Sequence, residues 1–279
     1  MLDAASLADL RARTVSVVRD AGELVLEGFR GAAGVRDDAV REKGVGGDLV
    51  TEHDEKAERF LRERLLRLVD GAAFVGEESG GEPGTGLAWY VDPIDGTGNF
   101  AHGHPWFSIS VGLWDGASPL LGVVHAPAMG LTFEAARGSG LFRNGRAARV
   151  SGNPDLSRAL LATGFPHDRA TRPDNNYRAY AALDAQTHGV RRCASAALEL
   201  ALVADGAYDG FWDSGLGAWD VAGAIALLLE AGGRVTDLSG EPFVLARRVE
   251  ILASNGLVHG ALADALAHAR ALPPIHEVP

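Results

Sequence analysis

The sequence has a single cysteine, Cys193, among its 279 residues. An intrachain disulfide is therefore impossible, and a reducing compartment, the cytoplasm, is the expected location. No apolar run approaches the roughly 18 uninterrupted residues that a membrane span requires. The first residues carry acids and arginines where a secretory signal would need an apolar stretch, so no such signal is expected.

Basic residues are also in short supply. Lys and Arg number 26 against 37 Asp and Glu, which gives a net charge of −11. Such an acidic chain is a poor electrostatic partner for nucleic acid or for an anionic membrane, and neither is expected to bind. Charged residues make up 23% and hydrophobic residues 47%, which excludes a largely disordered chain. The length fits one domain, 1–279, with two intimately packed halves of about 1–150 and 151–279.

Glycine, in contrast, is abundant. There are 36 glycines, about twice the usual share of ~7%. Many tight turns and close approaches between backbones should follow.

The spacing of apolar residues and the Gly and Pro punctuation predict mixed α and β layers. Helices are predicted at 7–29, 51–68, 175–187, 196–204, 219–231 and 261–271. Strands are predicted at 73–75, 87–91, 108–114, 121–125, 131–135, 141–150, 160–163, 190–192, 206–212, 235 and 251–253. The glycine-rich stretch 41–47 is interpreted as a mobile loop or a hairpin tip.

Acidic side chains collect where these elements end. Glu77 and Glu78 follow one strand, Asp92 and Asp95 follow the next, and Asp220 begins an apolar helix. In layered α/β folds, ligand sites lie at the ends of strands. Because no His or Cys cluster of the zinc type accompanies these acids, their hard oxygen ligands suit Mg²⁺, with Mn²⁺ as a second possibility.

A glycine-rich turn, 96–99, follows directly and is expected to open a short helix. Free backbone N–H groups at such a turn can hold a phosphate. Carboxylates for metal ions beside an anion cradle are the layout of metal-assisted phosphoester hydrolysis.

Four segments of the chain form a recognisable set, namely Trp89 to Phe100 (WYVDPIDGTGNF), Gly76-Glu77-Glu78, Trp219 to Ala224 (WDVAGA) and Asp48 to Asp54 (DLVTEHD). Together they resemble the signature of the inositol monophosphatase family. Their order and spacing fit over essentially the whole chain. The resemblance implies the layered αβαβα sandwich of the lithium-sensitive sugar phosphatases, with mixed sheets, usually as a homodimer.

The resemblance also implies roles for individual residues. Glu77, Asp92 and the Ile94 carbonyl would hold one Mg²⁺, Asp92, Asp95 and Asp220 a second, and a third, weaker ion would lean on Glu77. Thr97, hydrogen-bonded to Asp54, would orient the attacking water together with Glu77. The substrate contacts would be Gly96 and Thr97 to the phosphate, Ala194, Ser195, Ala196 and Asp213 to the alcohol, and Asp95 and Asp220 beside the metals.

The sequence departs from the family pattern at three positions. Gly98 stands where a second Thr is frequent, Ala194 stands where Gly is common, and Asp213 stands where inositol-hydrolysing members usually carry Glu. The shorter carboxylate at position 213 leaves the assignment as a phosphatase intact but opens the question of its preference for inositol.

The predicted function is a Mg²⁺-dependent phosphatase of small polyol monophosphates, foremost inositol 1-phosphate. Histidinol phosphate, fructose 1,6-bisphosphate, NADP and nucleotide 3′,5′-bisphosphates are alternatives on the same fold. The expected pocket residues include no obvious basic cluster for a second phosphate, which argues weakly against the bisphosphates. A binding protein that partners the transcription machinery is the alternative from another class, but it would have little reason to retain the full set of acids.

Several of these residues also have simpler interpretations. Thr51 and Asp54 fit a helix capping box, and Asp220 fits a helix N-cap. Cys193 is expected to be a buried thiol. A further set is expected to be structural rather than metal-binding, namely His102, His104 and His125. Lys43 belongs either to a plain exposed loop or to a lid.

Overall fold

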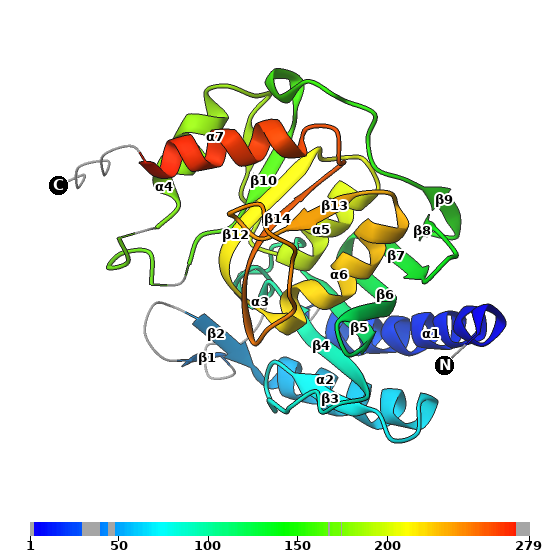
Figure 1. Ribbon diagram of the computed structural model, residues 1–279. Helices are drawn as coiled ribbons and strands as arrows, with labels where there is room; N and C mark the ends of the chain where they lie inside the picture. The colour runs from blue at the N-terminus through cyan, green and yellow to red at the C-terminus, as the bar shows by residue number, and fades with distance from the viewer. Residues whose placement is uncertain (1–2, 30–39, 44–47, 167, 174, 272–279) are drawn as a thin grey trace.

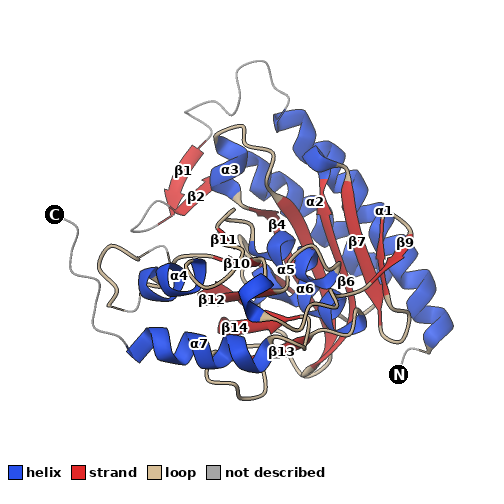
Figure 2. Ribbon diagram, turned by 90° about the horizontal axis from the view of Figure 1, so that it is seen from above, coloured by secondary structure: helices blue, strands red, loops and turns tan. Residues whose placement is uncertain are grey.

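The computed structural model describes residues 3–29, 40–43, 48–166, 168–173 and 175–271. Its layers run helix, sheet, helix, sheet, helix, as the predicted αβαβα sandwich requires (Figures 1 and 2). The helices are α1 (Ala4–Phe29), α2 (Glu52–Leu68), α3 (Thr97–Ala101), α4 (Tyr177–Asp184), α5 (Ala196–Ala204), α6 (Ala218–Glu230) and α7 (His259–Ala271).

The larger sheet has seven strands in sequence order, β3-β4-β5-β6-β7-β8-β9. Its members are β3 (Ala73–Gly76), β4 (Leu87–Asp95), β5 (Ser108–Asp115), β6 (Ser118–Ala126), β7 (Leu131–Ala136), β8 (Leu141–Arg143) and β9 (Arg146–Ala148). β3 and β4 run parallel, and every later pair is antiparallel. Strands β4 to β9 therefore form an antiparallel meander, and the expected element at 141–150 is the short hairpin β8–β9.

The smaller sheet has the order β11-β10-β12-β14-β13. Its strands are β10 (Leu161–Thr163), β11 (Val190–Arg191), β12 (Gly210–Gly217), β13 (Arg234–Thr236) and β14 (Arg248–Ser254). β10 lies parallel to β11 and β12, whereas β12, β14 and β13 are antiparallel. β1 (Val40–Lys43) and β2 (Asp48–Thr51) pair as a separate antiparallel hairpin, which confirms the hairpin interpretation, while its tip, 44–47, lies outside the described residues.

Three apolar clusters hold the layers together. α1 and α2 pack on the outer face of the larger sheet, α5 and α6 fill the space between the two sheets, and α4 and α7 cover the outer face of the smaller sheet (Figure 2). Every residue of α5 is buried. A helix that is apolar on all sides is typical of a central layer.

Glycines decide how closely α6 approaches the larger sheet. A Cβ on Gly122 of β6 would lie 2.1 Å from the carbonyl oxygen of Gly223, and one on Gly112 of β5 would lie 2.7 Å from the carbonyl carbon of Ala222. The helix and the sheet therefore meet backbone against backbone. This contact fixes the first turn of α6, and with it Asp220, relative to the end of β4.

The element boundaries differ from the prediction mainly at β12. This strand continues to Gly217, five residues beyond the predicted end at Trp212, because β14 pairs with it through a bulge near Gly215. Within the part of the chain that the structure describes, no helix is both long and apolar enough to cross a membrane.

Candidate active site

The site is built around the end of β4, where the ladder to β5 is interrupted. The register shifts between Asp92 and Asp95, and Pro93 lies inside this irregular stretch. Asp92 Oδ1 accepts a hydrogen bond from the N–H of Ile94 at 3.0 Å, which closes the turn locally. Gly96 then takes a left-handed conformation, with φ of 96°, and starts the short helix α3. The predicted turn and helix are therefore present.

Asp54 has two roles, one on each of its oxygens. Its Oδ2 accepts hydrogen bonds from the N–H and the hydroxyl of Thr51, at 2.8 and 2.6 Å, and completes the capping box of α2. Its Oδ1 accepts a hydrogen bond from the Thr97 hydroxyl at 3.1 Å. The hydroxyl also lies 3.0 Å from the Ile94 carbonyl oxygen. Asp54, which completes the cap of α2, thereby also orients Thr97, the first residue of α3.

Asp95 points to the N-terminus of α5. Its Oδ2 accepts hydrogen bonds from the hydroxyls of Ser195 and Ser108, at 2.6 and 3.1 Å, and from the N–H of Ala197 at 2.9 Å. Its Oδ1 accepts from the N–H of Ala196 at 3.0 Å. Asp95 therefore links the two halves of the chain and neutralises the positive end of a buried helix.

Glu58 positions the acidic turn after β3, and sequence reasoning missed it. Its two carboxylate oxygens accept hydrogen bonds from the N–H groups of Glu78 and Ser79, at 2.8 and 2.9 Å. The turn thus presents Glu77 to the cleft. The sequence did offer one indication of its role. Glu58 is an acid next to Ala57 on the apolar face of α2, where a buried residue is expected.

Asp220 is placed both to cap α6 and to contribute to the acidic site. It is the third residue of α6, and its Oδ2 accepts a hydrogen bond from the N–H of Gly217 at 2.7 Å, as an acid in a capping box does. Its side chain also lines the cleft. Helix capping and a place in the site are therefore compatible for this residue, as they are for Asp54.

A single cleft of about 630 Å³ collects most of the predicted residues. It is lined by Glu77, Asp92, Ile94, Asp95, Gly96, Thr97, Ala194, Ala196, Asp213 and Asp220. Three others of the predicted set stand elsewhere. Asp54 lies behind Thr97, Ser195 lies behind Asp95 with no exposed surface, and Glu78 is not among the lining residues.

Like charges are concentrated in this cleft. Burial, followed by the charges of Glu77, Asp95 and Asp220, raises the pKa of Asp92 well above its usual value, and a hydrogen bond with Glu77 acts in the same direction. Burial and the charges of Glu77 and Asp95 likewise raise the pKa of Asp220. Burial raises the pKa of Asp95, although the hydrogen bonds from Ser195 and α5 oppose it.

This electrostatic strain fits a divalent metal. Grouped carboxylates repel one another unless a cation lies between them, and an all-oxygen donor set suits Mg²⁺. In the conformation of the described residues, no three His, Cys, Asp or Glu side chains converge as a ready-made metal cage. In this conformation the carboxylate of Asp95 accepts hydrogen bonds from Ser195 and from the first N–H groups of α5.

Asp213 lies on β12 and is buried at the cleft wall. Burial raises its pKa to about 7, while hydrogen bonds from the N–H groups of Ser214 and Gly164 and the charge of Arg192 lower it. A Cβ at Gly164 would lie 2.0 Å from Asp213 Oδ2, so glycine is needed there. A second buried acid on the same wall, Glu199, was missed by sequence reasoning because it lies within the apolar helix α5.

Ala194 takes the left-handed backbone conformation, with φ of 59°. Only glycine adopts this region without steric cost, so Ala194 carries strain that the Gly expected at this position from the family resemblance would avoid. The exposed Ala194 lines the cleft immediately before α5. Asn99 fixes this turn from the other side, because its Nδ2 donates to the carbonyl of Cys193 at 2.7 Å.

The expectation that the pocket has no basic cluster was wrong. Four arginines, Arg169, Arg192, Arg247 and Arg248, line the same cleft. They come from three segments that are far apart in sequence, after β10, after β11 and at the start of β14, and reach the same cleft only in the folded molecule. No local run of basic residues contains all four arginines, so the sequence pattern does not reveal that they share a cleft.

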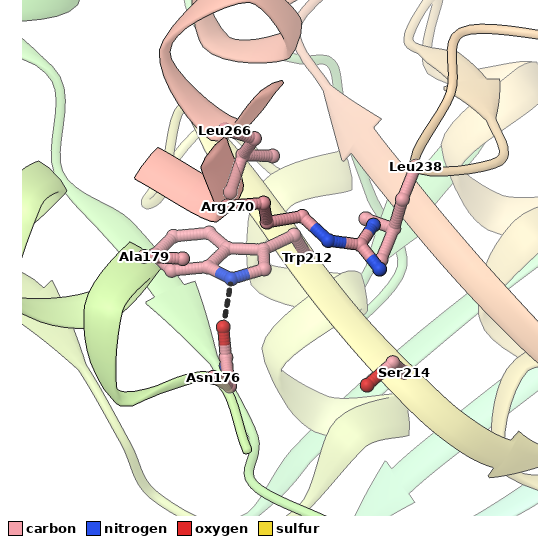
Figure 3. Close-up of a pocket in the computed structure, with 7 residues that line it drawn as sticks. All are labelled: Asn176, Ala179, Trp212, Ser214, Leu238, Leu266 and Arg270. Carbon is pink, nitrogen blue, oxygen red and sulfur yellow. Dashed lines mark hydrogen bonds between the residues drawn. The ribbon is translucent and has the colours of Figure 1, made fainter. Parts of the chain in front are cut away.

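A second cavity lies on the opposite face of β12. It is lined by Asn176, Ala179, Trp212, Ser214, Leu238, Leu266 and Arg270 (Figure 3). Trp212 Nε1 donates a hydrogen bond to Asn176 Oδ1 at 2.7 Å across its wall. With a volume of about 10 Å³ the cavity has room for about one water molecule, so it is a packing defect and not a substrate site.

Comparisons with known proteins agree with this geometry. The family model described as "Inositol monophosphatase family" matches residues 6–271. An inositol-1-monophosphatase of Synechocystis sp. is 42% identical over 230 residues, which cover 82% of this chain and 80% of that protein. The Nus factor SuhB of Pseudomonas aeruginosa is 41% identical over 228 residues, covering 80% and 83%. The solved structure of an inositol monophosphatase from Anabaena (Nostoc) sp. is 36% identical, has a TM-score of 0.85, and covers 96% of this chain and 98% of that one.

Proposed function

This chain belongs to the inositol monophosphatase family and is a phosphatase of phosphomonoesters, and we propose that it hydrolyses small polyol monophosphates such as inositol 1-phosphate with Mg²⁺. The observation that carries the proposal is the cleft in which Glu77, Asp92, Asp95 and Asp220 gather beside the turn at Gly96. The described residues that line it include no Ser, Cys or Lys side chain.

The carboxylates are assigned to the metal ions. Glu77, Asp92 and the Ile94 carbonyl would hold one Mg²⁺, and Asp92, Asp95 and Asp220 a second, with a third, weaker ion near Glu77. When bound, the ions supply positive charge to the phosphate oxygens and to the leaving alkoxide. Mn²⁺ would suit the same oxygen ligands.

Thr97 is assigned to the attacking water. Its hydroxyl is held by Asp54 Oδ1 and the Ile94 carbonyl, so its oxygen lone pairs face a fixed direction. A water that binds there would be oriented before reaction, and Glu77 lies at the same cleft to accept its proton. The N–H groups of Gly96 and Thr97 would bind the phosphate oxygens.

The alcohol part of the substrate is assigned to the wall formed by Ala194, Ala196 and Asp213. Ser195 would act indirectly, because its buried hydroxyl binds Asp95. The homodimer, inhibition by Li⁺ at the second metal site and the cytoplasmic location remain part of this proposal.

The proposal is tested by measuring phosphate release from inositol 1-phosphate with Mg²⁺ and with EDTA. Asp220→Asn is the test variant, because it removes one charge from the metal site and retains a side chain that can still accept from Gly217. Its matched control is Asp70→Asn, at an exposed residue beyond α2. We expect Asp220→Asn to lower kcat by about 10²–10³, the usual cost of one such electrostatic contact. Full turnover in EDTA, or equal rates of the two variants, would contradict the proposal.

A further inference from the structure

The turn before α5 forms part of the cleft wall that is assigned to the alcohol. Ala194 and Ala196 line the cleft there, and Ala194 takes the left-handed conformation with φ of 59°. A strained residue of this kind persists only where the surrounding structure fixes it from several sides. The position of this wall therefore depends on the groups that hold the backbone next to Ala194.

Two side chains hold the backbone of Cys193, one on each of its polar groups. The Cys193 N–H donates to Glu199 Oε1 at 2.9 Å, and the Cys193 carbonyl oxygen accepts from Asn99 Nδ2 at 2.7 Å. Asn99 lies on α3 and Glu199 on α5, so the turn is tied to both halves of the chain. We refer to Asn99 and Glu199 as the clamp.

Both members of the clamp are themselves fixed. Asn99 Nδ2 also donates to the Trp106 carbonyl at 2.6 Å, which anchors the side chain to the segment before β5. Glu199 is 1% exposed, on a helix whose residues are all buried. A buried carboxyl is costly unless it is hydrogen-bonded, and within the described residues its donor is the Cys193 N–H. The turn before α5 thus accounts for the presence of an acid in this apolar helix.

The Ala194 turn packs directly on the turn that is assigned to the phosphate. A Cβ on Gly96 would lie 2.9 Å from the Ala194 carbonyl oxygen, so the two turns meet backbone against backbone. Asp95 holds the far end of the wall, because it accepts from the N–H of Ala196 at 3.0 Å. The clamp is what holds the near end, at Cys193.

We propose that Asn99 and Glu199 are positioning residues of the reaction, which act by placing the Ala194 wall where it contacts the alcohol of the substrate. This inference rests on the proposed phosphatase function and assigns the affinity for the alcohol portion to two further residues. Loss of either hydrogen bond should weaken substrate binding about fivefold, which corresponds to about 1 kcal/mol, the usual net value of one hydrogen bond.

The test compares a ligand that has an alcohol portion with one that has none. KM and kcat are measured for inositol 1-phosphate with Mg²⁺, and inorganic phosphate is the competitive inhibitor. Glu199→Leu and Asn99→Ala should each raise KM about fivefold, while kcat and the Ki of inorganic phosphate stay within about twofold of wild type. A general loosening of the cleft would change all three constants, because the acids and the Gly96 turn lie in the same cleft.

A conservative variant and a matched control locate the effect. Glu199→Gln retains an oxygen that can accept from Cys193, so it should restore most of the affinity that Glu199→Leu loses. Glu230→Leu is the control, because Glu230 Oε2 accepts from the N–H of Gly140 at 2.9 Å and Glu230 does not line the cleft. An equal rise of KM in Glu230→Leu would assign the effect to general destabilisation and overturn the inference.

The double variant tests whether the two residues act through the same turn. Because both hold the backbone of Cys193, their effects should not be independent, and the rise of KM should stay well below the product of about 25-fold. A rise equal to the full product would show that Asn99 and Glu199 act on separate parts of the site, which overturns the clamp.

Failure of the inference is distinguishable from failure of the proposed function. An unchanged KM in both single variants, or an equal rise of KM and of the Ki of inorganic phosphate, refutes the clamp and leaves the phosphatase intact. If inositol 1-phosphate is not hydrolysed, the catalytic proposal fails, and isothermal titration of the same two ligands in Mg²⁺ buffer decides the inference. Asn99→Ala, at a half-buried residue, carries the test if Glu199→Leu does not fold.

Discussion

Asp213 should make the stability of the protein depend on pH in an unusual direction. Burial raises its pKa to about 7 in the folded chain, against an ordinary value of 3.8. Between these values the folded protein holds a proton that the unfolded chain has released. The free energy of unfolding should therefore fall as pH rises through this window, and the contribution of Asp213 is lost once the folded carboxyl ionises near pH 7.

The magnitude follows from the size of the shift. One pKa unit corresponds to about 1.4 kcal/mol. The contribution of Asp213 to the free energy of unfolding should therefore fall by roughly 2.5–3 kcal/mol between pH 5 and pH 8.5. In Asp213→Asn the side chain cannot ionise and the dependence disappears. The amide replaces an oxygen that accepts a hydrogen bond, which costs about 1 kcal/mol at every pH. Relative to wild type, the variant should gain roughly 4–5 °C in Tm between pH 5 and pH 8.5, because the unfolding entropy of a chain of 279 residues is large.

The assay is thermal and urea unfolding of wild type and Asp213→Asn in EDTA at pH 5, 6, 7, 8 and 8.5. The difference between the two proteins isolates Asp213 together with its coupling to Asp220 and Glu199, whose pKa values its charge raises. Groups that do not interact with Asp213 titrate in both proteins and cancel. A difference that does not change with pH would refute the reasoning, since it would place the folded pKa of Asp213 at its ordinary value.

Three further outcomes follow from single contacts. Ala194→Gly should remove the strain of a left-handed residue, which raises the free energy of unfolding by about 1–2 kcal/mol. About 0.4–1 kcal/mol of this gain is lost, because glycine gives the unfolded chain greater freedom. Calorimetry should show a Tm higher by up to about 3 °C, and a lower Tm would refute the claim of strain. Asp54→Asn removes the charged acceptor of the Thr97 hydroxyl, so kcat should fall roughly ten- to hundredfold with little change in KM. A change in KM alone would assign Thr97 to binding instead of chemistry. Gly122→Ala would place a Cβ 2.1 Å from a backbone oxygen of α6, and should cost about 1–3 kcal/mol of stability and lower activity by displacing the helix. Gly152→Ala, with no atom within 4 Å of its Cβ, is the control, and equal urea midpoints for the two variants would show that the close contact is not needed.

The local structure was readable from the sequence because short-range patterns encode it. The apolar helix at 196–204 was predicted with the bounds of α5, and the capping signature at Thr51 marks the observed start of α2. The acids at 92 and 95, predicted to follow a strand at 87–91, lie within the last four residues of β4, which ends at Asp95. Residues within about ten positions decide such features, since periodicity, caps and turn residues act over that distance.

Contacts between segments that are distant in sequence could not be predicted from local patterns. The orientation of Asp95 towards α5 depends on Ala196, 101 positions away. No pattern around Asp95 distinguishes a carboxylate that caps a helix from one that faces a metal. The role of Glu58 under the acidic turn was hidden for the same reason, because it acts 20 positions along the chain.

The sequence by itself determined the family, the layered architecture and the set of acids and turn residues that phosphomonoester hydrolysis requires. Only the tertiary structure decided which loops share the cleft with them. The cleft also takes in four arginines from segments whose own residues show no common pattern, namely Arg169, Arg192, Arg247 and Arg248. The packing of α5 and α6 between two sheets brings these loops together, and that packing is the sum of many apolar contacts across the whole chain.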